Sequence, residues 1–179
     1  GGGTDLGLLV SKRRQRFATV ISLARVEALR AVREVEDRLE IGGAATYTDA
    51  LPSLEKRYPA FGALVRRIGS RQIRNVGTLA GNLGTASPIG DTLPCLIALD
   101  AKVQLLSRQG QRGRTVEDFV LGYRKTGLRD DEIIAAIRVP FLAPGDRFFA
   151  YKISKRFDQD ISAVVAAFRL RLEGDVIRE

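Results

Sequence analysis

The sequence predicts an α+β fold for a chain of 179 residues. Its length, with 45% hydrophobic and 28% charged residues, is typical of one ordinary domain or two small lobes. Short strand patterns alternate with helical periodicity in the first part of the chain, and further strand patterns follow in the last third. Parallel-type elements are therefore expected early and antiparallel strands late.

Seven stretches predict β-strands, because their apolar and β-branched residues alternate with polar ones or form short runs between turn residues. These stretches lie at residues 18–23, 32–36, 39–42, 102–106, 133–139, 148–153 and 162–172. Asp37 and Arg38 separate the second stretch from the third, which indicates a hairpin. The polar residues 108–114 are expected to form a turn.

Helices are expected in the spaces between these strands. The basic residues 11–16 favour a short helix or turn, and Thr48 is a good N-cap for a helix that runs through residue 54. Residues 61–68 carry apolar side chains at positions i, i+3, i+4 and i+7, and Gly69 is expected to end that helix. Asp91 is expected to cap a helix that ends at residue 99.

Missing residue types exclude several kinds of site. The chain has no histidine, which excludes Ser-His-Asp and Cys-His constellations and histidine zinc sites. Cys95 is the single cysteine, so internal disulfides and an all-cysteine iron–sulfur cluster within this chain are excluded. Its apolar neighbours predict a packed, inert thiol. No apolar run approaches the ~20 residues of a membrane helix, and the cysteine usage fits a cytoplasmic protein.

The chain is strongly basic, with a formal net charge of +8. Lysine and arginine gather at residues 54–75 and 105–129. This charge suits a nucleic acid, an anionic cofactor or an acidic partner subunit. Aromatic residues make up 7% and do not alternate with basic ones, which disfavours a single-stranded nucleic-acid platform.

Two glycine-rich segments carry the candidate binding chemistry. Residues 1–7 let the backbone approach a ligand closely, which suits a pyrophosphate, but they match neither the P-loop nor the G-x-G-x-x-G pattern. Residues 72–91 are expected to be a loop that is too polar for a core. Its glycines allow close approach, its hydroxyls and amide can donate to phosphate oxygens, and Asp91 can accept from a sugar hydroxyl. The alternative is a structural turn with local Ser/Thr capping.

No catalytic residues and no metal ligands accompany these segments, so a bound cofactor is expected to carry the reaction. Six ordered motifs then resemble the FAD-binding domain of molybdenum hydroxylases, and are most similar to the small FeS/FAD subunit of bacterial xanthine dehydrogenases. The motifs lie at residues 2–7, 73–82, 86–91, 122–126, 132–134 and 151–156.

This resemblance implies a two-lobed FAD-binding fold of the vanillyl-alcohol oxidase (PCMH) type. An N-terminal α/β lobe would pack beside a lobe with an antiparallel sheet. Residues 1–145 would form the FAD-binding domain, truncated at its N-terminus, and residues 146–179 would begin the flavoprotein C-terminal domain. The chain starts with three glycines and contains no methionine, so we expect a processed or excised piece.

The resemblance also implies roles for individual residues. The first loop would hold the pyrophosphate through Gly2, Gly3, Thr4, Asp5, Leu6 and Gly7. The phosphates and adjoining sugars would be surrounded by Gly77, Thr78, Gly81, Asn82, Thr85 and Ser87. Asp91 would bind a cofactor hydroxyl, Ile68 stands where relatives often have an aromatic beside the flavin, and Ile133 and Ile134 would meet the ring edge. Lys152 would place a positive charge near the flavin, although the residue pattern alone indicates a surface lysine on an edge strand.

The implied function is electron transfer from iron–sulfur clusters through FAD to NAD in a xanthine-dehydrogenase-type enzyme of purine catabolism. The 2Fe-2S clusters and molybdopterin would lie on other domains or subunits, so this segment would not be active alone. The expected partners are a molybdopterin-binding large subunit, an iron–sulfur domain and NAD in a hetero-oligomer, with no nucleic acid and no membrane. The alternatives are a carbon-monoxide, aldehyde or aromatic-acid dehydrogenase flavoprotein segment, and a noncatalytic nucleic-acid-binding module.

Overall fold

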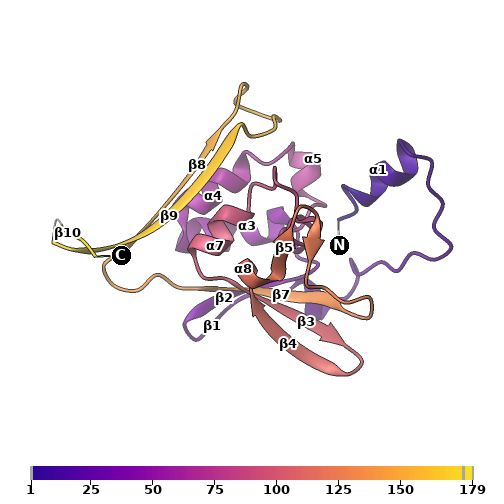
Figure 1. Cartoon of the computed structure of the whole chain (residues 1–179), viewed down its shortest axis with the longest axis horizontal. Coiled ribbons are helices and arrows are strands. Elements are labelled where there is room, and N and C mark those ends of the chain that lie inside the picture. The colour runs from indigo at the N-terminus through magenta and orange to yellow at the C-terminus, as the bar shows by residue number, and fades with distance from the viewer. Residues whose placement is uncertain (1, 175, 179) are drawn as a thin grey trace.

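The structure is a computed structural model that describes residues 2–174 and 176–178. A layer of helices lies between a five-stranded sheet and a three-stranded sheet (Figure 1). The helices are α1 (Leu6–Ser11), α2 (Glu27–Arg30), α3 (Tyr47–Arg57), α4 (Pro59–Arg66), α5 (Arg71–Arg74), α6 (Leu79–Thr85), α7 (Leu93–Ala98) and α8 (Val116–Phe119). This architecture confirms the predicted α+β class.

The larger sheet has the order β1-β2-β7-β3-β4. Its strands are β1 (Val32–Val35), β2 (Arg38–Gly42), β7 (Ile133–Pro140), β3 (Lys102–Ser107) and β4 (Gly110–Thr115). All neighbouring strands of this sheet pair antiparallel, and so do the strand pairs elsewhere in the described residues. The expectation of parallel elements early in the chain was therefore wrong. A short ribbon of β5 (Val120–Gly122) and β6 (Lys125–Thr126) lies beside it.

The main core lies between this sheet and the helices. Alternate residues of the three central strands point toward the helices and are fully buried, namely Leu39, Ile41, Val103, Leu105, Ile137 and Val139. Leu54, Phe61 and Leu83 meet them from α3, α4 and α6. The apolar spacing of residues 61–68 therefore predicted the buried face of α4, although the helix ends at Arg66, before Gly69.

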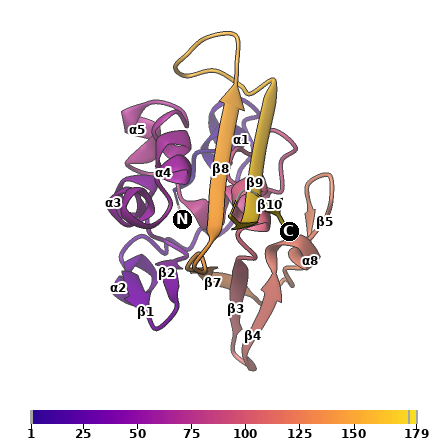
Figure 2. The same ribbon diagram turned by 90° about the vertical axis from the view of Figure 1, so that its left-hand side faces the viewer.

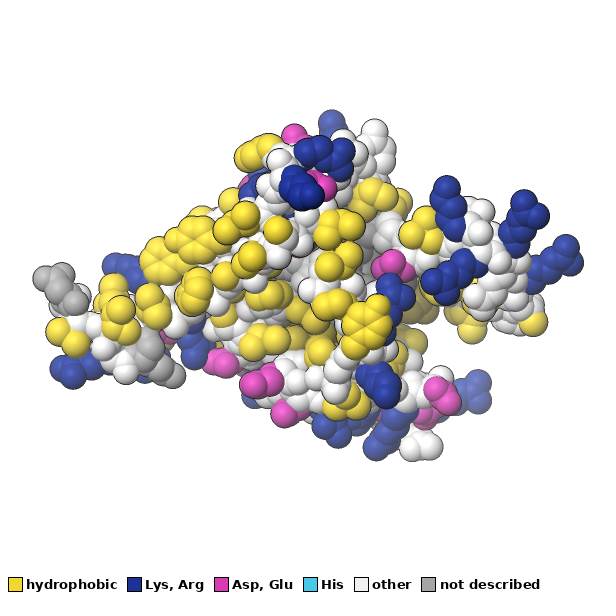
Figure 3. All heavy atoms as spheres, turned by 45° about the horizontal axis from the view of Figure 1, so that its top comes forward, with side chains coloured by type: hydrophobic (Ala, Val, Ile, Leu, Met, Phe, Trp, Pro, Cys, Tyr) yellow, Lys and Arg dark blue, Asp and Glu magenta, His cyan; other side chains and the backbone are white. Residues whose placement is uncertain are grey.

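The second sheet consists of β8 (Asp146–Ile153), β9 (Val164–Glu173) and β10 (Val176–Ile177). Strands β8 and β9 lie across the helical layer, where β8 contacts α4 and β9 contacts α7 (Figure 2). Phe149 pairs with Phe168 and Ile153 with Val164, and these four side chains are exposed on the outer face. Figure 3 shows the resulting band of hydrophobic side chains along the hairpin.

Several sequence expectations were wrong at the level of single elements. Residues 18–23 form no strand but lie in an irregular, mostly exposed segment in which Ile21 is 81% exposed, because no neighbouring strand pairs with them. Thr46, rather than Thr48, caps α3, where its side chain and that of Asp49 form a reciprocal capping box. Residues 108–114 are mostly strand β4, whose polar side chains suit an edge strand.

The loop expected at residues 72–91 contains two helices. Helix α5 takes up its start, and α6 begins after Thr78, whose side chain accepts a hydrogen bond from the Gly81 N–H. Asp91 does not cap α7, because Thr92 holds the N-cap position and makes no side-chain capping bond. In the part of the chain that the structure describes, no helix is both long enough and apolar enough to cross a bilayer.

Candidate functional site

A cavity of about 740 Å³ lies between the N-terminal segment and α6. It is lined by Gly2, Gly3, Thr4, Asp5, Leu6, Leu8, Leu9, Lys12, Arg13, Tyr47, Thr78, Gly81, Asn82, Gly84, Thr85, Arg124 and Leu128. The two glycine-rich segments of the sequence therefore meet at one place in the fold, although more than 60 residues separate them. Gly1, which belongs to the predicted first loop, lies outside the described residues.

Helix α6 presents one polar face to this cavity. Leu79, Ala80 and Leu83 are buried on its core side. The opposite face carries residues 78, 81, 82 and 85, whose spacing of i, i+3, i+4 and i+7 places them on one side of a helix. This periodicity was present in the sequence, but the glycines within it favoured a loop.

Three polar side chains on this face are held in defined positions. Thr78 accepts from the Gly81 N–H at 2.8 Å and keeps its own hydroxyl hydrogen for another acceptor. Asn82 accepts from the Thr92 hydroxyl at 2.5 Å, so its amide N–H groups stay free to donate. The Thr85 hydroxyl lies 3.2 Å from the Asp5 carboxylate, which links α6 to the N-terminal loop.

The N-terminal loop packs closely against the backbone before α6. A Cβ on Gly2 would lie 2.3 Å from the Val76 carbonyl oxygen, and Gly3 has a φ of +71°. Both positions therefore need glycine, the first for close approach and the second for its conformation. This packing fixes the loop that forms one wall of the cavity.

The cavity is electropositive. Lys12, Arg13 and Arg124 line it, and none of the three forms an ion pair with a described residue. Arg124 lies in the turn between β5 and β6, where its N–H donates to the Ala86 carbonyl at 3.0 Å and ties the turn to the end of α6. Asp5 is the single carboxylate among the lining residues.

Tyr47, Gly84 and Arg124 line the cavity but were not among the predicted contacts. The sequence contained features that could have indicated two of them, because Arg124 lies in the motif at residues 122–126 and Gly84 lies in the second glycine-rich segment. Tyr47 had no such signal, because the N-cap of α3 was assigned two residues too late. Burial raises the pKa of the Tyr47 phenol above its ordinary value, and the charges of Asp91 and Asp5 raise it further.

Some predicted contacts lie outside the lining of the cavity: Gly7, Ile68, Gly77, Ser87, Asp91, Ile133, Ile134 and Lys152. Gly77 supports the wall from behind, because its carbonyl accepts from the Tyr47 N–H at 2.8 Å. The Ile134 side chain reaches α6, where its Cδ1 would lie 3.4 Å from a Cβ on Gly84. Ile68 and Ser87 are half-buried near the ends of α4 and α6.

Asp91 and Lys152 bind each other. The Lys152 Nζ lies 2.5 Å from one Asp91 carboxylate oxygen, and the Ser162 hydroxyl donates to the other oxygen. The Lys152 side chain is 3% exposed and the Asp91 side chain 9%, so the interpretation of Lys152 as a surface lysine was wrong. Lys152 also donates to the Arg67 carbonyl, and Arg67 returns a hydrogen bond to the Lys152 carbonyl at 2.6 Å. This cluster joins β8 to the helical layer.

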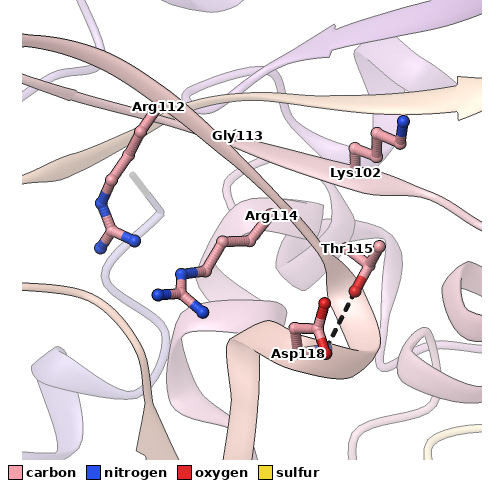
Figure 4. Close-up of a pocket in the computed structure, with 6 residues that line it drawn as sticks. All are labelled: Lys102, Arg112, Gly113, Arg114, Thr115 and Asp118. Atoms are coloured by element: carbon pink, nitrogen blue, oxygen red, sulfur yellow. Dashed lines mark hydrogen bonds between the residues drawn. The ribbon is translucent and has the colours of Figure 1, made fainter.

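A second hollow, of about 570 Å³, lies on β3 and β4 and is lined by Lys102, Arg112, Gly113, Arg114, Thr115 and Asp118 (Figure 4). Arg112 is already bound by the Glu132 carboxylate at 2.5 and 2.7 Å and by the Gly127 carbonyl. Thr115 caps α8 by accepting from the Asp118 N–H at 3.0 Å. These groups stabilise local structure, so the first cavity is the better candidate.

The first cavity is suited to binding rather than to acid–base catalysis. Its glycines, hydroxyls, amide and cations fit an extended anionic ligand. Cys95 is buried at the start of α7, which confirms the prediction of a packed thiol, and burial raises the pKa of this thiol to about 12, as expected for an unreactive one. The described residues contain no group of three or more potential metal ligands.

Comparisons with known proteins agree with these observations. Residues 1–142 match the family described as the FAD binding domain in molybdopterin dehydrogenase. The chain is 33% identical to xanthine dehydrogenase of Emericella nidulans over 96% of this chain and 14% of that protein. It is 30% identical to the nicotinate dehydrogenase FAD-subunit of Eubacterium barkeri over 96% of this chain and 60% of that subunit.

The fold is also similar to solved structures. In the carbon monoxide dehydrogenase from Hydrogenophaga pseudoflava, one chain superimposes with a TM-score of 0.93 at 26% identity. That similarity covers 100% of this chain and 63% of the other. The chain thus spans less than two thirds of the length of each of these relatives.

Proposed function

Because this chain belongs to the family of FAD-binding domains in molybdopterin dehydrogenases, we propose that it binds FAD in the cavity between residues 2–6 and α6. The observation that supports this location is the meeting of both predicted glycine-rich segments at one electropositive cavity. The residues fit the cofactor, since a phosphate needs hydrogen-bond donors, cations and room for close backbone approach. The hydrogen-bond donors and cations are Thr78, Asn82, Lys12 and Arg124. Room for close backbone approach is left by Gly81 and Gly84.

In this proposal each wall of the cavity has a separate task. The loop at residues 2–6 and the polar face of α6 hold the pyrophosphate and the adjoining sugars. Ile134, whose side chain reaches Gly84, would cover the flavin end, and Ile68 and Ile133 are also proposed to contact the flavin. FAD, when bound, supplies the ability to accept electrons and to pass them on, and this chain supplies position and charge.

We further propose that the complete protein transfers electrons from 2Fe-2S clusters through FAD to NAD, in an enzyme of the xanthine dehydrogenase type. Relatives named xanthine dehydrogenase support this assignment. Molybdopterin, the iron–sulfur domain and a large subunit would be its partners in a cytoplasmic hetero-oligomer. Relatives that act on nicotinate or carbon monoxide support the alternative of another molybdenum hydroxylase.

Residues 1–145 and 146–179 are proposed to belong to two domains. The support is the outer face of β8 and β9, where Phe149, Tyr151, Ile153 and Phe168 are between 39% and 60% exposed. An apolar sheet face of this kind is normally covered by another element. Residues 146–179 would then be the first strands of a domain that covers this face.

Replacing Asn82 by Asp tests the location of the cofactor. The carboxylate can still accept from Thr92 but places a negative charge where the proposal places phosphates. In the complete protein we expect Asn82→Asp to weaken FAD about tenfold or more, because like charges in contact cost several kcal/mol.

Asn75→Asp is the matched control. Asn75 also uses its side-chain oxygen to accept from a threonine, Thr48, at 2.8 Å, but it does not line the cavity. Its FAD affinity should equal that of the unmodified protein. Equal affinity of all three proteins for FAD would contradict the proposed location.

A further inference from the structure

Tyr47 is held rigidly at the edge of the cavity. It is the first residue of α3, directly after the Thr46–Asp49 capping box, and its N–H donates to the Gly77 carbonyl at 2.8 Å. Two of its ring carbons lie 3.1 and 3.2 Å from the place that a Cβ on Gly77 would occupy. The ring therefore fills the space beside Gly77.

The hydroxyl of this buried tyrosine is unused. Tyr47 is 4% exposed and lines the cavity, and no described residue forms a hydrogen bond with its side chain. The hydroxyl oxygen itself is not among the buried polar atoms that lack a partner in the described residues, so it opens into the cavity, where a ligand can reach it. Tyrosine hydroxyls that are buried within the protein normally bond to protein groups instead. Tyr58 shows the ordinary case, since its hydroxyl lies 3.0 Å from the Val139 carbonyl and 2.8 Å from that of Pro140.

The surroundings determine what kind of partner this hydroxyl can take. Burial and the nearby charges of Asp91 and Asp5 keep the phenol protonated, so it can act as a donor throughout the physiological pH range. Lys12, Arg13 and Arg124 line the same cavity and favour an anion within it. A donor in an electropositive cavity is matched by an anionic oxygen acceptor such as a phosphate.

We propose that the Tyr47 hydroxyl donates a hydrogen bond to a phosphate oxygen of FAD and is therefore a cofactor-positioning residue. This inference rests on the proposed function, because it places FAD in the same cavity. It adds to the cavity a donor on α3, in addition to those on the N-terminal loop and α6. The cofactor would then be contacted by three separate elements of the chain.

The test compares Tyr47→Phe with Tyr58→Phe in the complete protein after removal of FAD. FAD affinity is measured by titration of flavin fluorescence, ADP affinity by competition with FAD, and stability by urea denaturation without FAD. Tyr47→Phe should weaken FAD and ADP by about the same factor, tenfold or more, because the lost bond is to a charged group. Its stability without FAD should not fall, since the hydroxyl has no protein partner. Tyr58→Phe should show the reverse pattern, with lower stability and unchanged affinities.

Several results would overturn the proposal, and each identifies what failed. Unchanged FAD affinity in Tyr47→Phe, with the expected loss in Asn82→Asp, would reject the role of Tyr47 and leave the proposed cavity intact. Weaker FAD binding with unchanged ADP affinity would place the contact away from the phosphates. Lower stability of FAD-free Tyr47→Phe would show that the hydroxyl serves the protein itself. If Asn82→Asp also bound FAD normally, the proposed site would fail together with this inference.

Discussion

Removal of the Asp91 carboxylate tests the buried cluster that joins β8 to the helices. In Asp91→Ala, the Lys152 ammonium stays buried and keeps the Arg67 carbonyl as an acceptor, at 3.3 Å. Removing one partner of a buried ion pair costs about 3–5 kcal/mol, because the remaining charge is uncompensated. The Ser162 hydroxyl also loses its acceptor, which adds about 1 kcal/mol. We expect the free energy of unfolding to fall by about 4 kcal/mol or more.

Urea denaturation of the FAD-free protein measures this loss, and two further variants interpret it. The double variant Asp91→Leu/Lys152→Met removes both charges, so it should recover most of the stability that Asp91→Ala loses. Asp100→Asn removes the charge that pairs with Arg169 but keeps a side chain suited to the φ of +51° at this position; because the Asp100 side chain is 64% exposed, this change should cost about 1 kcal/mol or less. A loss below about 1 kcal/mol in Asp91→Ala would refute the assigned role of the pair. A separate loss of FAD affinity in a folded Asp91 variant would support the predicted contact with a cofactor hydroxyl.

Three other predictions concern single side chains. Gly84→Ala should stabilise the FAD-free protein by about 0.5–1 kcal/mol, because alanine favours a helix and its Cβ would only touch Ile134; a clear loss in urea denaturation would contradict this. Cys95 should resist a thiol reagent until the protein is unfolded, since its pKa is raised to about 12, and rapid labelling of the native protein would disagree. Arg112 lowers the pKa of Glu132 from 4.5 to about 2, so the stability from this pair is present above pH 4.5 and is lost as the pH falls through 2. The difference in urea midpoint between the unmodified protein and Glu132→Gln should therefore shrink between pH 5 and pH 2, and a constant difference would argue against the pair.

Much of the fold could be predicted because burial leaves a periodic pattern. The alternation at residues 102–106 and the largely apolar stretch at residues 133–139 predicted β3 and β7, and both strands carry fully buried side chains. The stretch at residues 18–23 is similarly apolar, but it has no pairing partner in the fold, and a single stretch of sequence does not contain that information. Strand β4 was missed for the opposite reason, because its pairing with β3 stabilises a segment of polar residues.

The sequence predicted the two main segments of the candidate site. It did not predict the features of the site that depend on contacts between residues far apart in the sequence. Glycine content pointed to residues 1–7 and 72–91, and the parts of these segments that line the cavity lie within residues 2–6 and 78–85. The pairing of Asp91 with Lys152 could not be read from the sequence, because 61 positions separate the two residues. The unused hydroxyl of Tyr47 depends on which residues surround it, so it becomes visible only in the folded chain.

The location of FAD is tested most directly by an experimental structure of the complete protein with the cofactor bound. We expect the pyrophosphate between residues 2–6 and the face of α6 that carries Thr78 and Asn82, with the Tyr47 hydroxyl within hydrogen-bond distance of a phosphate oxygen. FAD bound elsewhere, for example in the hollow formed by Lys102 and Arg114, would contradict the proposed site.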